Sequence, residues 1–220
     1  MSERWSAHGN VYVVAEGEYE LSDDGAIVVL RIEGDDIEVE IVNPDGSHAE
    51  MSGNGTRIAG AWLMERTGND TARVRVGPRV VDVRRVGDLF ESVLDVRVLE
   101  RERVAGLDVT PVDVGNPHAV VLGDPDDIAL IGPMLETHPR FPNRTNVQVA
   151  RVDAPGRVSA RVWERGVGET QASGTSAVAV AAATHDEGEI VVSFPGGDLR
   201  VRLDGRRASL IGPAERIHEC

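Results

Sequence analysis

The sequence contains no lysine, and its only cysteine is the last residue, Cys220. All 23 basic side chains are therefore arginines. The absence of lysine excludes a pyridoxal Schiff base and a Walker-type phosphate lysine. The near absence of cysteine excludes disulfides, thiolate zinc sites and a thiol nucleophile within the fold. The chemistry of this chain is therefore left to hydroxyls, carboxylates, imidazoles, guanidiniums and the backbone.

Positive charge and long apolar runs are also scarce. The 220 residues carry a net charge of −14, and nucleic acids and anionic membranes are bound by clustered cations. No apolar run approaches the roughly 20 residues of a membrane span, and residues 1–9 lack the apolar core of a signal peptide. We therefore expect a cytoplasmic protein with no nucleic-acid or membrane partner, whose acidity serves solubility.

Glycine and proline punctuate the chain every 8 to 15 residues, with valine-rich, often alternating runs between them. Such runs are typical of strands. Helical spacing or helix-start signals predict only three helices, over residues 56–66, 126–138 and 176–185. Strands are expected at residues 11–15, 27–32, 37–42, 74–86 with a turn at 77–78, 89–96, 109–114, 119–122, 145–152, 158–163, 190–194, 199–203 and 208–211.

Two of the expected helices begin alike. One follows Ser52-Gly53-Asn54-Gly55, and the other follows Ser173-Gly174-Thr175. Each start comes after a strand and an acidic turn, which indicates an internal duplication, although chance similarity of two glycine-rich starts is the alternative. We expect an α/β fold of the α+β type with two pseudo-symmetric domains, each a curved, mostly antiparallel sheet around a central helix. The halves are residues 1–106, completed by 214–220, and residues 107–213.

Helix starts of this kind leave several backbone N–H groups available, and the helix dipole adds positive potential. Two starts facing one cleft would hold a small carboxylate or phosphate from both sides. The alternative is ordinary capping by Ser52 and Ser173. The glycines at 53, 55 and 60 do not have dinucleotide-fingerprint spacing, Ser173 lacks the first glycine of a nucleophile elbow, and the six histidines show no metal-site spacing. No metal is therefore predicted.

The chain resembles the diaminopimelate epimerase family, within the cofactor-independent amino-acid racemase and epimerase superfamily. The matching segments span nearly the whole chain, and the glutamate-arginine-glycine run and the Gly-Asn-Pro-His turn are the most specific. They are HGN at 8–10, NPDGS at 43–47, SGNGTR at 52–57, GNPH at 115–118, FPNRTNV at 141–147 and WERGVGET at 163–170, followed by SGT at 173–175.

The resemblance implies that an amino acid is bound between the two helix starts, without metal or pyridoxal cofactor. Gly53, Asn54, Gly174 and Thr175 would contact the reacting α-carboxylate. Glu164 and Arg165 would hold the polar end of the substrate, for which a bidentate arginine and a carboxylate are suited. The polar lining would be completed by Asn10, Asn43, Asn116 and Asn146.

The sequence departs from the family in two places. Ser52 and Ser173 occupy the positions of the family's acid and base cysteines. A thiol has a pKa of about 8.5, whereas a serine oxyanion is several pKa units more basic, and each unit costs about 1.4 kcal/mol. His118 is a candidate auxiliary base if it lies near. In addition, residues 16–36 replace a helix and a glycine-rich loop of the family with a short acidic turn and a strand.

Three hypotheses remain open. The first is an isomerase that converts LL- to meso-diaminopimelate, a lysine and cell-wall precursor, by two-base proton transfer at weak or altered activity. The second is an isomerase or dehydratase of the same superfamily with a single base, for which Glu164, Glu50 and His118 are candidates. The third is a non-catalytic amino-acid-binding homologue, or a form inactivated by replacement of both cysteines. A homodimer is expected from the family alone.

Overall fold

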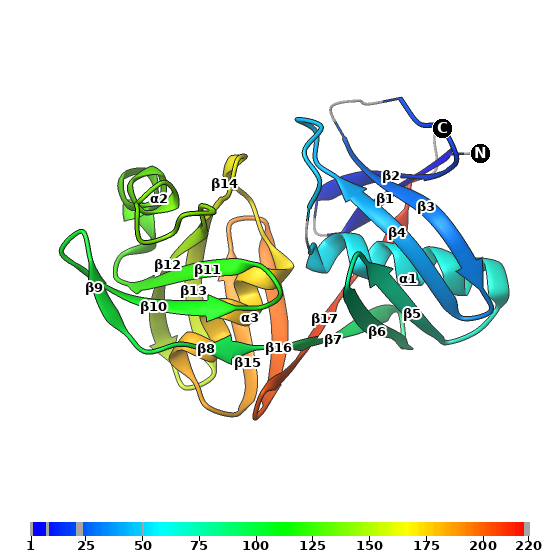
Figure 1. The fold of residues 1–220 in the computed structure, drawn as a ribbon. Coiled ribbons are helices and arrows are strands. Elements are labelled where there is room, and N and C mark those ends of the chain that lie inside the picture. The colour runs from blue at the N-terminus through cyan, green and yellow to red at the C-terminus, as the bar shows by residue number, and fades with distance from the viewer. Residues whose placement is uncertain (1, 8, 21–23, 50, 218–220) are drawn as a thin grey trace. The chain divides into compact units, whose positions relative to one another are not determined.

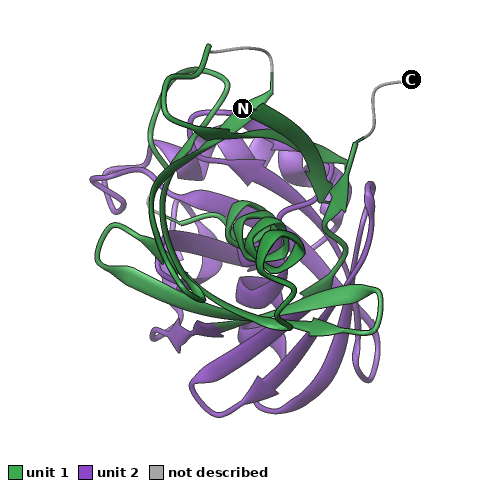
Figure 2. Ribbon diagram, turned by 90° about the vertical axis from the view of Figure 1, so that its right-hand side faces the viewer, with its two compact units in different colours: residues 1–93, 211–220 green, residues 94–210 purple. Residues whose placement is uncertain are grey.

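The computed structural model describes residues 2–7, 9–20, 24–49 and 51–217 (Figure 1). Glu50, named above as a candidate base, and Cys220 lie outside the described residues. The chain forms two compact units, residues 1–93 with 211–220 and residues 94–210 (Figure 2). The second unit begins earlier than the expected half at 107, because strands β8 (Arg97–Val98) and β9 (Glu102–Val104) pair with β10 (Leu107–Asp113) of that unit.

Unit 1 is a mixed sheet around one helix. Strand β1 runs antiparallel to β2, β2 parallel to β3, β3 antiparallel to β4, and β4 parallel to β5. Strands β5, β6 and β7 continue antiparallel, and the short β18 pairs with β1. The elements are β1 (Ser2–Ala7), β2 (Asn10–Glu16), β3 (Gly25–Glu33), β4 (Asp36–Val42), α1 (Gly53–Thr67), β5 (Thr71–Val76), β6 (Arg79–Val86), β7 (Leu89–Asp95) and β18 (Glu215–Arg216).

Unit 2 repeats this connectivity. Strand β10 runs antiparallel to β11, β11 parallel to β12, β12 antiparallel to β13, β13 parallel to β15, and β15 antiparallel to β16. The elements are β10 (Leu107–Asp113), β11 (Pro117–Leu122), η1 (Pro125–Asp127), α2 (Ile128–Glu136), β12 (Asn146–Ala154), β13 (Arg157–Glu164), β14 (Gly168–Thr170), α3 (Gly174–Thr184), β15 (Gly188–Phe194) and β16 (Gly197–Asp204). Strand β17 (Arg207–Gly212) begins in unit 2 and ends in unit 1.

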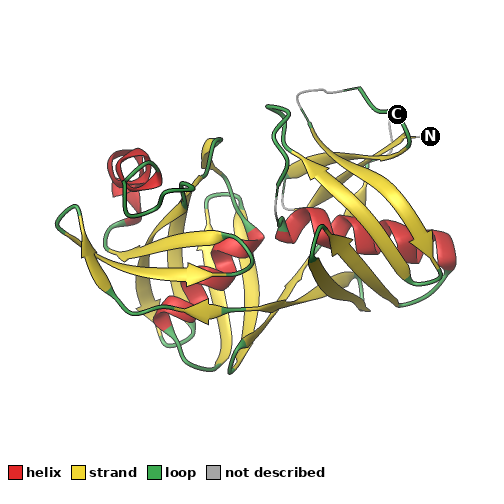
Figure 3. Ribbon diagram, viewed as in Figure 1, coloured by secondary structure: helices red, strands yellow, loops and turns green. Residues whose placement is uncertain are grey.

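The order of parallel and antiparallel pairs matches strand by strand from β1 and β10 onward, with α1 and α3 at the same crossover. This repeated order supports the internal duplication. The units differ between their second and third strands: unit 2 carries η1 and α2 there, whereas residues 17–20 and 24 of unit 1 form no helix. The expected α/β class, with mostly antiparallel pairing and few helices, is confirmed (Figure 3).

Both crossover helices are central. Every residue of α1 from Gly53 to Met64 is buried, and so is every residue of α3 from Gly174 to Ala181. A helix that is buried on all sides shows little amphipathic pattern. This explains why both begin earlier than the sequence predicted, since their first turns are polar or glycine-rich yet enclosed. Figure 2 shows α1 end-on, with the strands of its unit around it.

Gly60 of α1 lies against the sheet. A Cβ at this position would stand 2.8 Å from Cβ and Cγ1 of Val83 on β6, a distance that real Cβ atoms do not tolerate. Gly60 therefore allows α1 to pack closely against β6. This helix–sheet contact explains why a third glycine follows Gly53 and Gly55.

Among the described residues, no helix combines the length and the apolar character needed to cross a membrane.

Candidate active site

The candidate residues of each unit lie at one edge of its sheet. In unit 1, Tyr12 near the start of β2 pairs with Gly25 at the start of β3, while Ala26 pairs with Val42 at the end of β4. The starts of β2 and β3 and the end of β4 therefore share an edge. The chain leaves that edge at Asn43 and enters α1 after Ser52.

In unit 2 the same edge is defined by two pairs. His118 of β11 pairs with Asn146 of β12, and Val147 pairs with Trp163 at the end of β13. Glu164 ends β13, and α3 begins after Ser173. In both units a parallel crossover therefore brings a helix N-terminus to the edge that carries the predicted polar residues.

Ser52 caps α1. Its Oγ accepts a hydrogen bond from the N–H of Gly55 at 3.0 Å, as expected of an N-cap serine. The hydroxyl of Tyr12 lies 3.2 Å from the same Oγ. Glycine at position 55 lets this turn pack closely against β4, since a Cβ would stand 2.8 Å from Cδ1 of Ile41. The capping alternative is therefore realised at Ser52, with Tyr12 as a second contact.

Arg57 holds the first turn of α1 from within. Its guanidinium is fully buried and donates to Asn54 Oδ1 at 2.7 Å, to Gly53 O at 3.4 Å and to Pro213 O at 2.9 Å. Burial lowers the pKa of Arg57 to about 10, which still leaves it charged near neutrality. A buried cation behind Gly53 and Asn54 adds positive potential to a turn that already carries the positive end of the helix dipole.

The remaining unit 1 candidates lie in strand ends and turns. Asn10 begins β2 and pairs with Ala7. Asn43 donates through Nδ2 to Ser47 Oγ at 2.9 Å, so its side chain is held within its own turn. Hydrogen bonds from the hydroxyl and N–H of Ser47 lower the pKa of Asp45 in the same turn.

Ser173 differs from Ser52 in the partner of its hydroxyl. It is 6% exposed and makes no side-chain hydrogen bond to α3, although it occupies the N-cap position. Glu164, at the end of β13, accepts a hydrogen bond from Thr170 Oγ1 at 2.6 Å. Desolvation raises the pKa of Glu164, and hydrogen bonding to Thr170 and Ser173 partly opposes that rise. Ser173 therefore lies beside a carboxylate whose basicity is increased.

The turn after Glu164 is anchored from two sides. Asn146 Oδ1 accepts from the N–H of Arg165 at 3.0 Å, and Arg165 Nη1 donates to Asn143 O at 3.3 Å. Behind them, the buried carboxylate of Glu136 accepts from Gly166 N and from Trp163 Nε1, both at 2.7 Å, and also from Arg144 Nη2. These contacts determine where the Arg165 backbone lies.

His118 and Asn116 belong to a buried network. His118 is 1% exposed, its Nε2 lies 2.8 Å from Asn116 Oδ1, and its Nδ1 lies 3.0 Å from Gln148 Nε2. Asn116 Nδ2 in turn donates to Thr175 Oγ1 at 3.4 Å, in the first turn of α3. Desolvation lowers the pKa of His118 to about 3. Because both ring nitrogens are occupied and the ring is a weak base, this arrangement argues against the auxiliary-base role considered for His118.

The sequence interpretation missed several residues that hold the candidate groups. Two signals were available: Gln148 is a polar residue inside a valine-rich strand, and Tyr12 lies two positions after Asn10 on the same strand face. The missed residues are Tyr12, Arg57, Glu136, Gln148 and Thr170.

Within the described ranges, no group of three or more histidine, cysteine, aspartate or glutamate side chains has the geometry of a metal site.

Solved structures of low sequence identity share this fold. A hydroxyproline epimerase from Agrobacterium vitis aligns with a TM-score of 0.77 at 14% identity, over 99% of this chain and 90% of its own. A PhzF-family phenazine biosynthesis protein from Bacillus anthracis aligns with a TM-score of 0.72 at 14% identity, over 99% and 96%. The fold is therefore the one found in PhzF proteins and amino-acid epimerases.

Sequence relatives identify the family more narrowly. The family model described as diaminopimelate epimerase matches residues 110–217. A diaminopimelate epimerase from Pelotomaculum thermopropionicum is 35% identical over 88% of this chain and 81% of its own length. One from Desulforudis audaxviator is 36% identical over 89% and 82%. The chain belongs to the diaminopimelate epimerase family.

Proposed function

We propose that this chain is an isomerase of the epimerase type that acts on the α-carbon of an amino acid without pyridoxal. The candidate substrate is diaminopimelate, interconverted between its LL and meso forms. One observation carries the proposal: Ser52 and Ser173 cap helices at the same crossover of two repeated units, and each begins a buried first turn. Family membership supports the reaction class.

The first turns of α1 and α3 are suited to a carboxylate. The N–H groups near the start of a helix have no partner within the helix, and the dipole makes that end positive. In this proposal Gly53, Asn54, Gly174 and Thr175 contact the α-carboxylate. Charge that develops at the α-carbon when its proton leaves spreads onto this carboxylate, so the same N–H groups stabilise the transition state.

Proton removal is the demanding step, because a serine oxyanion is a much stronger base than a thiolate. We propose that Glu164 reduces this demand at Ser173. The Ser173 hydroxyl passes its proton to Glu164 as its oxygen takes the α-proton, and the electron pair of the broken C–H bond remains on the substrate. The raised pKa of Glu164 brings it closer to neutrality and makes it a better acceptor than an ordinary glutamate.

Reprotonation from the other face is assigned to Ser52. Its hydroxyl proton goes to the α-carbon, and the resulting oxyanion recovers a proton from solvent. Ser52 Oγ already accepts from Gly55 N and contacts Tyr12, but the end of β4 provides Asn43 where β13 provides Glu164. An amide cannot serve as the proton acceptor. We therefore expect interconversion to be slow, with proton exchange at the Ser173 face faster than inversion.

A single-base reaction is the second candidate. It is favoured by the same asymmetry: Ser173 lowers the pKa of a nearby carboxylate, whereas Ser52 contacts a phenol and a backbone N–H. Glu164 would then exchange the α-proton on one face and return it there. In the third candidate, the site binds the amino acid and moves no proton.

Proton exchange in heavy water separates these three functions. LL- and meso-diaminopimelate are incubated with the protein, α-hydrogen loss is followed by NMR, and the stereoisomers are resolved by chiral chromatography. Exchange with inversion supports the two-serine isomerase, and exchange with full retention supports the single-base reaction. Saturable binding without exchange supports the binding protein, and absence of binding and of exchange contradicts the proposed function.

From family membership we also propose that the reaction belongs to lysine and cell-wall precursor biosynthesis. We propose further that the protein acts in the cytoplasm as a homodimer.

A further inference from the structure

A row of buried polar side chains in unit 2 ends at the first turn of α3, and its first member has no role in the proposed reaction. Gln148 is completely buried on β12. Its Nε2 lies 3.0 Å from His118 Nδ1 and 2.9 Å from Ser176 Oγ. From His118 the contacts continue through Asn116 to Thr175 Oγ1.

The hydrogen bonds in this row run in one direction. An amide nitrogen only donates, so His118 Nδ1 accepts from Gln148, and the neutral ring carries its proton on Nε2. Nε2–H then donates to Asn116 Oδ1. With its oxygen engaged there, Asn116 presents its Nδ2 to Thr175 Oγ1, which accepts.

The opposite direction is less favourable. In the arrangement described, one buried atom of the Gln148 amide, Oε1, has no hydrogen-bond partner among the described residues. Turning the amide over would satisfy that oxygen and leave both N–H groups without acceptors. Buried N–H groups without partners are rarer and more costly than carbonyl oxygens with spare lone pairs. The orientation of Gln148 therefore sets the tautomer of His118.

The direction of the row matters at its end. Thr175 Oγ1 accepts from Asn116, so its own hydroxyl proton is directed elsewhere. We propose that Gln148 is a positioning residue that fixes this direction, so that the hydroxyl of Thr175 donates to the ligand carboxylate at the start of α3. This inference rests on the proposed function for the presence of that carboxylate, whereas the direction of the row rests on contacts within unit 2 alone.

The tautomer of His118 tests the direction without a ligand. Nitrogen-15 NMR distinguishes the two neutral tautomers, with His118→Gln as the assignment control. We expect the Nε2–H form in the native protein. Gln148→Glu presents an acceptor to Nδ1 and should move the proton to Nδ1 or protonate the ring. Gln171→Glu alters the exposed Gln171 on the loop before α3 and should leave the Nε2–H form unchanged.

Two results overturn the direction of the row: a native protein in the Nδ1–H form, or a Gln148→Glu variant that keeps Nε2–H. If Gln148→Glu does not fold, the nearly isosteric Gln148→Met decides. It removes the donor, so both tautomers should be populated, and a pure Nε2–H form would contradict the role of Gln148.

Binding of meso-diaminopimelate by calorimetry tests the consequence. Gln148→Met should weaken binding by roughly 3- to 10-fold, the effect of one misdirected hydrogen bond. Thr175→Val should weaken it at least as much, and adding Gln148→Met to Thr175→Val should cost nothing further. Losses that multiply independently overturn the coupling between Gln148 and Thr175. Absence of binding by the native protein contradicts the proposed function, while the tautomer measurement still decides the direction.

Discussion

Ser173 interacts with the Glu164 carboxylate and lowers its pKa, while its side chain makes no hydrogen bond to α3, the helix whose N-cap position it occupies. Ser52, at the corresponding crossover of unit 1, binds the N–H of Gly55 and serves its own helix. Two serines at equivalent positions are thus used differently: Ser52 contributes to helix stability, whereas Ser173 is held beside a carboxylate.

This difference predicts unequal costs of removing the hydroxyls. Ser52→Ala should lower the free energy of unfolding by about 1 kcal/mol, since an N–H of α1 loses its cap. Ser173→Ala removes no side-chain partner from an N–H of α3, so its cost should come from the lost interaction with the Glu164 carboxylate and should shrink toward pH 4, where that carboxylate is protonated. Urea unfolding of the two variants at pH 7 and pH 4 measures both values. A loss for Ser173→Ala that is the same at both pH values would contradict the assignment of partners.

The raised pKa of Glu164 predicts a pH-dependent gain on its replacement. A glutamate with a raised pKa in the folded state takes up its proton more readily there, so its ionisation weakens folding as pH rises above the unfolded-state value. Glu164→Gln should therefore be more stable than the native protein at pH 7, and the difference should shrink toward pH 4. Denaturant titrations at both pH values measure it.

Glu169→Gln is the matched control for that comparison. Glu169 lies on β14 close to Glu164 but is exposed and paired with Arg161, so its loss should cost no more than about 1 kcal/mol. A Glu164→Gln variant less stable than the native protein at pH 7 would show that burial does not penalise the charge of Glu164.

Burial of neutral His118 predicts acid sensitivity. Its pKa is about 3 in the fold against 6.5 for an unperturbed side chain, so the unfolded chain binds this proton first. The stability that neutral His118 contributes to the fold is complete above pH 6.5 and is lost as pH falls from there toward 3. Between pH 7 and pH 5 the loss is about 2 kcal/mol.

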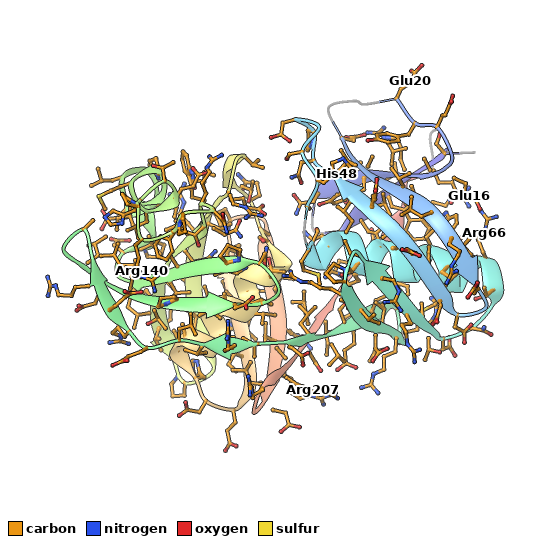
Figure 4. All side chains as sticks on the ribbon, viewed as in Figure 1. Glu16, Glu20, His48, Arg66, Arg140 and Arg207 are labelled. Carbon is orange, nitrogen blue, oxygen red and sulfur yellow. The ribbon has the colours of Figure 1, made fainter. Side chains whose placement is uncertain are left out.

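His118→Gln should remove this part of the pH dependence, and urea unfolding at pH 7 and pH 5 measures it. His48→Gln is the control, because His48 is exposed on the loop after β4 (Figure 4). An unchanged acid loss in His118→Gln, or protonation of the native His118 ring above pH 5 in an NMR titration, would contradict the account.

Close packing at Gly60 predicts a rescue. Gly60→Ala should lower the free energy of unfolding by about 1–3 kcal/mol, because the new methyl group meets Val83, even though alanine favours helix. Val83→Ala makes room, so the double variant should lose less than the sum of the single losses. Thermal unfolding of the native protein, the two single variants and the double variant measures the coupling. Additive losses would show that the cost of Gly60→Ala does not come from its contact with Val83.

The sequence predicted the elements with strong patterns. Valine alternation located most strands, and the two similar helix starts indicated the repeat. Strand β1 was missed because Ser2–Ala7 is largely polar, with Trp5 and Ala7 its buried residues, and its pairing with β2 and β18 defines it as a strand. Helix α2 begins later than predicted, because Pro125–Asp127 forms a 3₁₀ turn first.

The places of the candidate residues in the fold were predicted as far as motifs extend. Ser52, Ser173, Asn116 and Glu164 are placed at strand ends and helix starts, as the spacing indicated. The partners that define their roles were not predictable, because Tyr12, Gln148 and Thr170 reach them through sheet pairing and through turns. In the sequence, Arg57 has the spacing of an exposed polar residue on an amphipathic helix, whereas in the structure it is buried.

In the proposed function, the site keeps the groups that bind the amino acid and lacks only an efficient acid and base. The direct test is conversion of LL-diaminopimelate in heavy water by the native protein and by the double variant Ser52→Cys, Ser173→Cys, with Ser159→Cys as a control for an added thiol outside the site. We expect the double variant to form meso-diaminopimelate at least about 100-fold faster than the native protein, since two pKa units of base strength correspond to that factor. A folded double variant that binds the substrate and forms no meso product would contradict it.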